Sequence, residues 1–116
     1  MTMPMVFIFA AAVGAVLRYL ADFYLPTRGI LLVNVLGSCL AGVIVGLTWA
    51  AVVDTFLAEL LLGGFAGSLT TYSTVALSTA RQTAENLKTV VVTWLGHVGW
   101  STAACVIGLL ATVHLW

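Results

Sequence analysis

Four long apolar stretches, separated by short polar segments, constrain this chain more than any other feature of its sequence. Of its 116 residues, 62% are hydrophobic and 7% are charged, whereas an ordinary soluble domain has roughly 25% charged residues. So few charges could not cover a water-facing surface. A helix that crosses a bilayer needs about 20 mostly apolar residues, which each stretch supplies. The sequence therefore predicts an all-α membrane protein.

The whole chain, residues 1–116, is expected to form one domain of four transmembrane helices. The spans are expected at about residues 5–25, 30–53, 56–80 and 89–116. A tight turn at residues 26–29, a short polar connection at Asp54 and a polar loop at residues 81–88 join them. We interpret the first stretch as a span and not as a signal peptide, because no Lys or Arg precedes it and no small-residue cleavage pattern ends it.

The third span has an unusual centre, where glycine and hydroxyl residues form the run GSLTTYST at residues 67–74. In one interpretation, the hydroxyls bond back to carbonyls one turn earlier and merely bend the helix. In the other, the helix breaks, and protein or a water-filled path buries the freed polar groups. The density of polar residues favours a break in mid-membrane, with Gly67–Thr71 non-helical and binding a cation.

Two polar side chains in the first two spans allow alternative interpretations. Asn34 carries an amide inside an apolar helix, where it needs partners; a hydrogen bond between helices and a pore-lining role are equally compatible with it. Arg18 lies one turn before Asp22, and the two could pair. We favour an arginine whose head reaches the membrane interface, although at a channel vestibule it could attract anions.

The fourth span carries a weakly polar face, with His97, Ser101 and Cys105 one turn apart. This face could be a polar track or ordinary helix–helix contact, and His97 could carry a proton. Cys39 and Cys105 are interpreted as small buried residues and not as a disulfide. The four acidic residues all fall near span ends or in loops: Asp22, Asp54, Glu59 and Glu85.

Several classes of function are disfavoured by the sequence. No Cys/His cluster has the spacing of metal ligands, and no glycine-rich loop has the context of a phosphate-binding site. The formal net charge is zero, so nothing indicates a nucleic-acid partner. We therefore expect neither an enzyme nor a nucleic-acid-binding protein.

Three motifs resemble those of the CrcB/Fluc family of bacterial fluoride channels. The sequence GAVLRY at residues 14–19 resembles the family's GAxxRY, and VNVLGS at residues 33–38 resembles its NxxGS. The sequence GFAGSLTTYST at residues 64–74 resembles its GFxGGFTTFSTF. The motifs occur in the expected order in three successive spans, so the resemblance covers most of the chain.

The resemblance implies a subunit that passively exports fluoride across the bacterial inner (plasma) membrane and so lowers fluoride toxicity. It implies an antiparallel, dual-topology dimer with two pores and a structural Na⁺ at its centre. The backbone carbonyls of Gly67 and Thr70 would hold that ion, and Arg18 would stand at the vestibule. The residues that would line the fluoride pore are Asn34, Thr71, Tyr72, Val75 and Ser101.

The chain departs from the family pattern at several positions. Tyr72 stands where the family has its first pore phenylalanine, and it keeps a ring edge while adding a hydroxyl. Val75 replaces the second phenylalanine and has no ring. Ser78 replaces a glutamate, and Ser68 and Leu69 replace the usual Gly and Phe. A fluoride path built from these residues would lack part of its usual lining.

The basic residues are unevenly distributed between the two sides of the predicted bundle. The side with the first and third loops holds Arg28, Arg81 and Lys88, with Arg18 in the nearest half of the first span, and the other side has none. The positive-inside rule places those loops in the cytoplasm and both termini outside. We therefore expect a fixed orientation and a heterodimer with an oppositely oriented partner; the alternative is a homodimer.

Two rival functions fit a small four-span protein. A small multidrug-resistance-type transporter needs a membrane-embedded glutamate in its first helix, and the first span here has none. A non-conducting structural or accessory subunit is the other alternative, and the changes at Val75 and Ser78 favour it.

Overall fold

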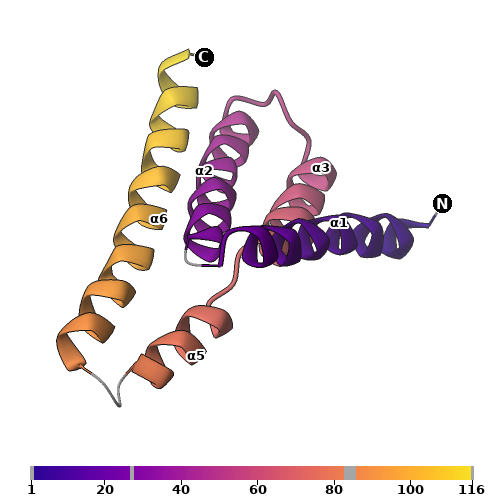
Figure 1. The fold of residues 1–116 in the computed structure, drawn as a ribbon. Helices are drawn as coiled ribbons and strands as arrows, with labels where there is room; N and C mark the ends of the chain where they lie inside the picture. Colours follow the sequence, from indigo (N-terminus) through magenta and orange to yellow (C-terminus); the bar gives the residue numbers. More distant parts are fainter. Residues whose placement is uncertain (1, 27, 83–85, 116) are drawn as a thin grey trace.

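The chain is all-helical in the computed structural model, which describes residues 2–26, 28–82 and 86–115. Figure 1 shows the arrangement of its helices. In chain order they are α1 (Met3–Tyr24), α2 (Gly29–Trp49), α3 (Thr55–Glu59), η1 (Leu60–Ala66), α4 (Gly67–Leu69), α5 (Ser73–Gln82) and α6 (Leu87–Leu115). Within the described residues, four helical stretches are long and apolar enough to cross a membrane, the third running through Thr55–Arg81. The all-α class predicted from the sequence is confirmed.

The connection between α2 and α3 begins earlier than the apolar pattern indicated. The helix ends at Trp49 and not near residue 53, because Ala51 takes a positive φ of 57°. The next helix starts at Thr55, and the carboxylate of Asp54 caps it by accepting the Leu57 N–H at 2.7 Å. Thr27 in the predicted turn, residues 83–85 in the predicted loop, and Trp116 at the predicted end of the last span lie outside the described residues.

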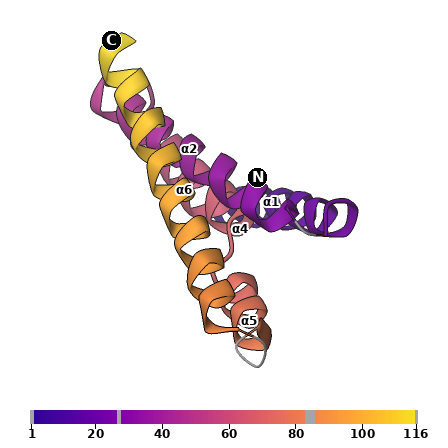
Figure 2. The ribbon, with the colours of Figure 1, turned by 60° about the vertical axis from the view of Figure 1, so that its left-hand side comes forward.

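The largest helix–helix interface joins α2 to α6, which run side by side in Figures 1 and 2. Their backbones touch, because a Cβ added at Gly42 would meet the Cys105 carbonyl, and one added at Gly108 would meet the Cys39 carbonyl. Small residues permit this close approach in membrane helices, which lack a hydrophobic force to join them. Gly42 in the second span thus has a packing role.

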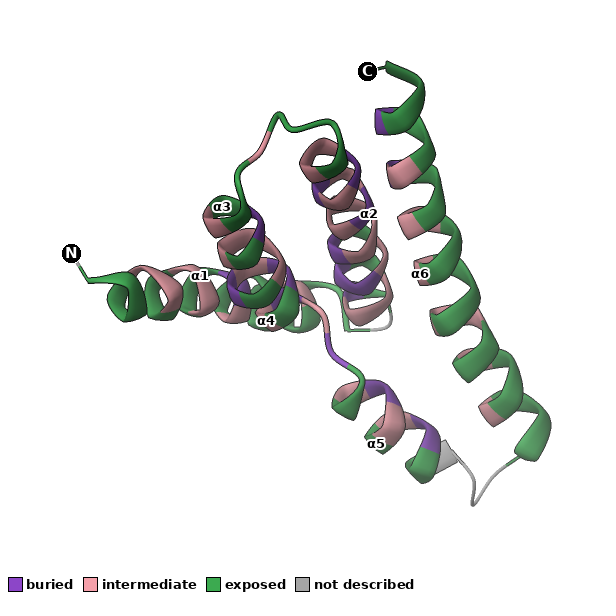
Figure 3. Ribbon diagram, turned by 180° about the vertical axis from the view of Figure 1, so that it is seen from behind, coloured by how far each residue is buried: buried purple, intermediate pink, exposed green. Residues whose placement is uncertain are grey.

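The other elements are arranged around the third span. The η1 segment is π-helical, and the Gly67 N–H that follows it donates to the Leu62 carbonyl, five residues back. The long α1 crosses η1 and α4, while α5 packs against the N-terminal part of α6 (Figures 1 and 3). In Figure 3, α1 and α6 are largely exposed, and α1 buries only Gly14. The chain therefore presents apolar side chains outward, as a protein in lipid does.

The contact at Gly108 gives a first prediction. Gly108→Ala should destabilise the fold by about 1–3 kcal/mol, because its methyl group would press on the α2 backbone. Gly99→Ala, on the same helix with nothing within 4 Å of the added Cβ, is the matched control. Denaturation of the two variants in detergent micelles, followed by circular dichroism, measures the difference, and equal stabilities would contradict this packing.

Candidate functional site

The helical backbone of the third span is interrupted at residues 70–72. Helix α4 ends at Leu69, Thr70 is extended with φ −81° and ψ 153°, and helix resumes at Ser73. The prediction that the whole of Gly67–Thr71 is non-helical is therefore wrong for its first three residues. The Thr70 N–H still donates to the Ala66 carbonyl at 3.0 Å, so the helix continues until the next N–H is drawn elsewhere.

The hydroxyl groups before the interruption behave as the bending interpretation expected. Ser68 Oγ donates to the Phe65 carbonyl at 2.9 Å, and Thr70 Oγ1 donates to the Ala66 carbonyl at 3.0 Å. Such bonds satisfy a hydroxyl within its own helix. Bonding back and interruption of the helix thus occur together, and these hydroxyls alone do not explain why the helix stops.

The Asn34 side chain on α2 explains where the helix stops. Its Oδ1 accepts the Thr71 N–H at 2.7 Å, and its Nδ2 donates to the Thr71 carbonyl at 3.0 Å. Both residues are buried, with 8% of their surface exposed. A backbone N–H can only donate, so this bond also fixes which end of the amide is oxygen. The Asn34 amide therefore bonds both the N–H and the carbonyl of Thr71, as the backbone of an adjacent β-strand would.

This pairing leaves two backbone carbonyls without their helical partners. The Thr71 N–H, which would bond to Gly67 in a continuous helix, is donated to Asn34. The Thr74 N–H, which would bond to Thr70, lies 3.4 Å from Thr71 Oγ1 instead. At membrane depth, a carbonyl that loses its helical partner needs another donor, water or a cation.

A cavity of about 150 Å³ lies beside these carbonyls. Its lining residues are Gly37, Ser38, Ala41, Leu62, Ala66, Gly67 and Thr70. Carbonyl oxygens are the ligands that hard cations prefer. The carbonyls predicted to hold Na⁺, those of Gly67 and Thr70, therefore fit that ion in their chemistry, and the ion itself stays a prediction.

A larger cavity, of about 230 Å³, also adjoins the interruption. Five of its lining residues are those predicted to line a pore: Asn34, Thr71, Tyr72, Val75 and Ser101. The others are Thr70, Trp94, His97 and Val98. We call this space the main cavity. It brings together residues from α2, from the interruption, from α5 and from α6, while their role toward an ion remains a prediction.

His97 was not among the residues predicted to line the pore. Its Nδ1 lies 3.5 Å from Asn34 Nδ2, and it lines the main cavity. It also lines a second cavity of about 240 Å³, together with Asp22 and Ser78. The sequence did carry a signal for this placement: His97 lies four residues before Ser101, and residues four apart share a helix face.

Arg18 lies apart from these residues. It is half-buried on α1 and lines neither the main cavity nor the second one. Within the described part of the chain it forms no ion pair with Asp22, although the spacing allowed one. A vestibule role for Arg18 stays a prediction.

The three sequence motifs meet at the interruption. A Cβ at Gly37 would meet the Thr70 side chain, and one at Gly14 would meet Ser68 and the Phe65 carbonyl at 2.5 Å. The glycines of the first two motifs thus let α1 and α2 approach the third. Because Gly37 lies one turn after Asn34, the same helix face supplies both the close contact and the amide.

Fold and site together define a multi-pass membrane protein whose interrupted third span lines a cavity between helices. The chain belongs to the CrcB family: the family model described as "CrcB-like protein, Camphor Resistance (CrcB)" matches residues 5–109. This shared family explains why the three motifs occur in order.

Two relatives extend this comparison. The chain is 42% identical over 81 residues to the "Fluoride-specific ion channel FluC 1" of Streptomyces avermitilis. This match covers 63% of this chain and 64% of that protein, which is less than two thirds of the relative's length. It is 31% identical over 110 residues to the "Fluoride-specific ion channel FluC" of Methanococcus maripaludis, covering 89% of each.

The Asn34 pairing gives a second prediction. Asn34→Leu should speed hydrogen exchange of the Thr71 amide by about 10- to 100-fold, because loss of a buried partner costs about 1–3 kcal/mol. Amide exchange followed by nuclear magnetic resonance in micelles measures this rate. Ser101→Ala, which changes the same cavity without touching the pairing, is the control and should leave the rate unchanged. Unaltered protection in Asn34→Leu would show that another group holds Thr71.

Proposed function

We propose that this chain is a subunit of a fluoride-selective channel that exports fluoride passively from the cytoplasm. The observation that carries the proposal is the main cavity: it gathers Asn34, Thr71, Tyr72, Val75 and Ser101 at the helix interruption. Membership of the CrcB family and two relatives named as fluoride-specific ion channels support the choice of ion. The proposed activity is transport and not catalysis.

The side chains of the main cavity suit a small, strongly hydrated anion. A selective path must replace the water around such an ion with other donors. The Asn34 amide and the Thr71 and Ser101 hydroxyls supply N–H and O–H groups, and the edge of the Tyr72 ring is positive. Val75 adds only an apolar wall to this lining.

A structural Na⁺ is part of the proposal. The Gly67 and Thr70 carbonyls would hold it at the dimer centre, because their helical partners are redirected and both residues line a small cavity. A fixed cation supplies positive charge that compensates an anion nearby.

An antiparallel second subunit would complete the path. Tyr72 is 67% exposed, although it belongs to a stretch of non-helical backbone that lipid cannot solvate. Such backbone occurs at membrane depth only where protein or water buries it. A second chain laid across the interruption would cover Tyr72 and close the main cavity against the bilayer.

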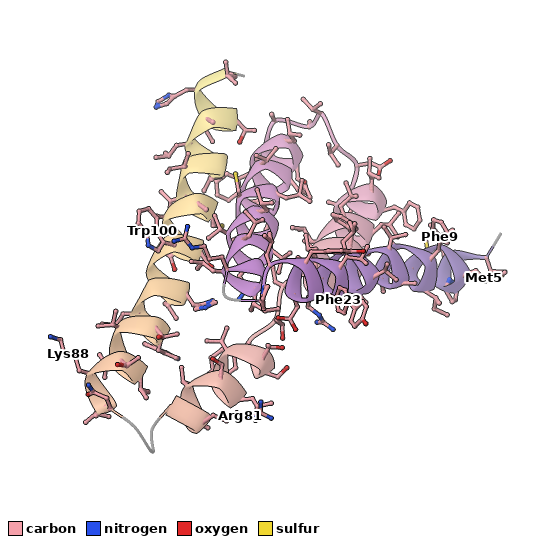
Figure 4. The ribbon with its side chains drawn as sticks, viewed as in Figure 1. Met5, Phe9, Phe23, Arg81, Lys88 and Trp100 are labelled. Carbon is pink, nitrogen blue, oxygen red and sulfur yellow. The ribbon has the colours of Figure 1, made fainter. Side chains whose placement is uncertain are left out.

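We favour a different chain as that partner. Arg81 and Lys88 lie at one end of the molecule, and the C-terminus lies at the opposite end (Figures 1 and 4). The positive-inside rule would hold that basic end in the cytoplasm of a bacterial cell, across its inner membrane. A chain fixed in this way would not supply its own inverted mate, whereas a homodimer requires it to insert both ways.

The rival functions differ in what they require of the site. A proton-coupled transporter needs an acid inside the membrane, and the acidic residues Asp22, Asp54 and Glu59 are exposed at or near element ends. A non-conducting accessory subunit is favoured by one observation, that Val75 supplies no ring to the main cavity.

Fluoride flux tests the proposal directly. Purified protein in liposomes, alone and with its co-purified partner, should release trapped fluoride down its gradient and retain chloride. Ion-selective electrodes measure both anions, and protein-free liposomes report the leak. Release that needs a proton gradient would point to a transporter, and no release under either condition would favour the accessory subunit.

Orientation tests the partner. Reporters fused at the C-terminus, one active only in the cytoplasm and one only outside it, should show an external C-terminus for nearly all molecules. Moving the basic residues by Arg81→Gln and Lys88→Gln should make the two signals more equal. Comparable signals from the unaltered chain, or fluoride channels formed by this chain alone, would refute the heterodimer.

A further inference from the structure

The hydrogen-bond capacity of Asn34 is only partly used by Thr71. Its Nδ2 carries two hydrogens, one of which is donated to the Thr71 carbonyl. The same nitrogen lies 3.5 Å from His97 Nδ1. An amide NH₂ group cannot accept a hydrogen bond, so in this arrangement Nδ1 presents its lone pair and the neutral imidazole carries its hydrogen on Nε2.

The contact between the two side chains is loose. Strong hydrogen bonds that involve N–H groups span about 2.7–3.2 Å, and this distance is longer. Asn34 is held in place by its two bonds to Thr71, while His97 is half-buried on α6. The second Asn34 hydrogen is therefore a weakly engaged donor on a fixed side chain. It faces His97, whose charge can change.

His97 also stands between two cavities. It lines the main cavity beside Ser101 and Tyr72, and it lines the second cavity beside Asp22 and Ser78. Val75 is the other residue that both cavities share. An ion passing from one cavity to the other would therefore pass the imidazole.

Among the described residues, the elements near this imidazole carry these other titratable groups. Helix α2 contributes Cys39, and α5 contributes Arg81 in its exposed last turn. Tyr72 and Asp22 share the two cavities with it, and α6 itself carries Cys105 two turns on and Lys88 near its start. Asp22 lines the second cavity with His97, and Arg81 is a like charge at a solvent-exposed position.

We propose that Asn34 and His97 form a proton-linked binding site for a small anion. When His97 takes a proton from solvent on Nδ1, its N–H and the free N–H of Asn34 both point into the gap between them. Two donors facing each other repel, and an anion that accepts from both relieves that repulsion. In the neutral pair, the same Asn34 N–H instead donates to the Nδ1 lone pair, so the pair offers the anion neither donor.

This inference rests on the proposed function for its ion, fluoride, and adds regulation by pH. Linkage is reciprocal, so fluoride should promote protonation of His97 as much as protonation promotes fluoride binding. With one proton taken up per anion, fluoride affinity should rise by up to about tenfold for each unit that the pH falls, while His97 is mostly neutral.

The chain permits a clean observation of this histidine, because it has only two. The other, His114, is exposed near the end of α6, and His114→Gln leaves His97 as the single imidazole. Ring-nitrogen resonance of the ¹⁵N-labelled variant in nanodiscs reports tautomer and protonated fraction. The titration spans about pH 5.5 to about pH 8, around the ordinary histidine pKa of about 6.5.

Three results are expected. Without fluoride, the neutral ring should be the Nε2–H tautomer. Sodium fluoride at constant pH should increase the protonated fraction of His97, and sodium chloride at equal ionic strength should not. An Nδ1–H tautomer, no response to fluoride, or an equal response to chloride would each overturn the proposal, the last because screening by salt would explain it.

A second measurement does not depend on observing the ring. Calorimetric titration with sodium fluoride should give an affinity that rises as the pH falls in the His114→Gln protein. His97→Gln keeps a neutral hydrogen-bonding side chain without a titrating proton, and its fluoride affinity should not change with pH. A pH dependence that persists in His97→Gln would assign the proton to another group.

These outcomes are separable from the fate of the channel proposal. A response of His97 to fluoride in a protein that conducts no fluoride would leave the anion site and remove the channel. Fluoride flux in a protein whose His97 ignores fluoride would leave the channel and remove this site.

Discussion

The rest of the site depends on the pairing of one buried side-chain amide with one peptide unit. Asn34 takes both the N–H and the carbonyl of Thr71, which a continuous helix would have used within itself. The consequence is threefold: the helix stops after Leu69, the Gly67 carbonyl loses its partner, and the Thr71 hydroxyl stands next to a cavity. In lipid, where water cannot replace a lost partner, the exchange is possible because the amide satisfies both groups that it draws away.

That pairing requires α2 to lie very close to the third span. Gly37, one turn after Asn34, provides the space against Thr70, and Gly14 does the same for α1 against Ser68. A larger residue at Gly37 would push α2 away from the third span and carry the amide out of reach of Thr71, and one at Gly14 would push α1 away from Ser68. Small residues between helices, together with hydrogen bonds across them, provide the association that hydrophobic burial provides in water. The three sequence motifs, on α1, α2 and the third span, thus pack against one another in a single interface.

Much of this arrangement follows from the sequence. The apolar stretches predicted the all-α class, and the resemblance brought together residues that line one cavity. Local composition placed the start of the interruption too early. Glycine and hydroxyl residues indicate a region of low helix stability, whereas the residue at which the helix ends depends on Asn34, which is distant in sequence and accepts the Thr71 N–H. The π-helical segment Leu60–Ala66 has no signal of its own in a run of Leu and Gly. His97 was not predicted to line the pore, because the sequence does not show that its ring lies beside Asn34.

The central claim is that Asn34 holds Thr71 out of the helix in the membrane. Solid-state nuclear magnetic resonance of the chain in lipid bilayers tests it most directly, by observing Thr70 and Thr71 together with the Asn34 side chain. The account predicts extended-backbone carbon shifts for Thr70 and a through-space contact between Asn34 Nδ2 and the Thr71 carbonyl carbon. Helical shifts through Thr70 and Thr71, with no contact to Asn34, would contradict it.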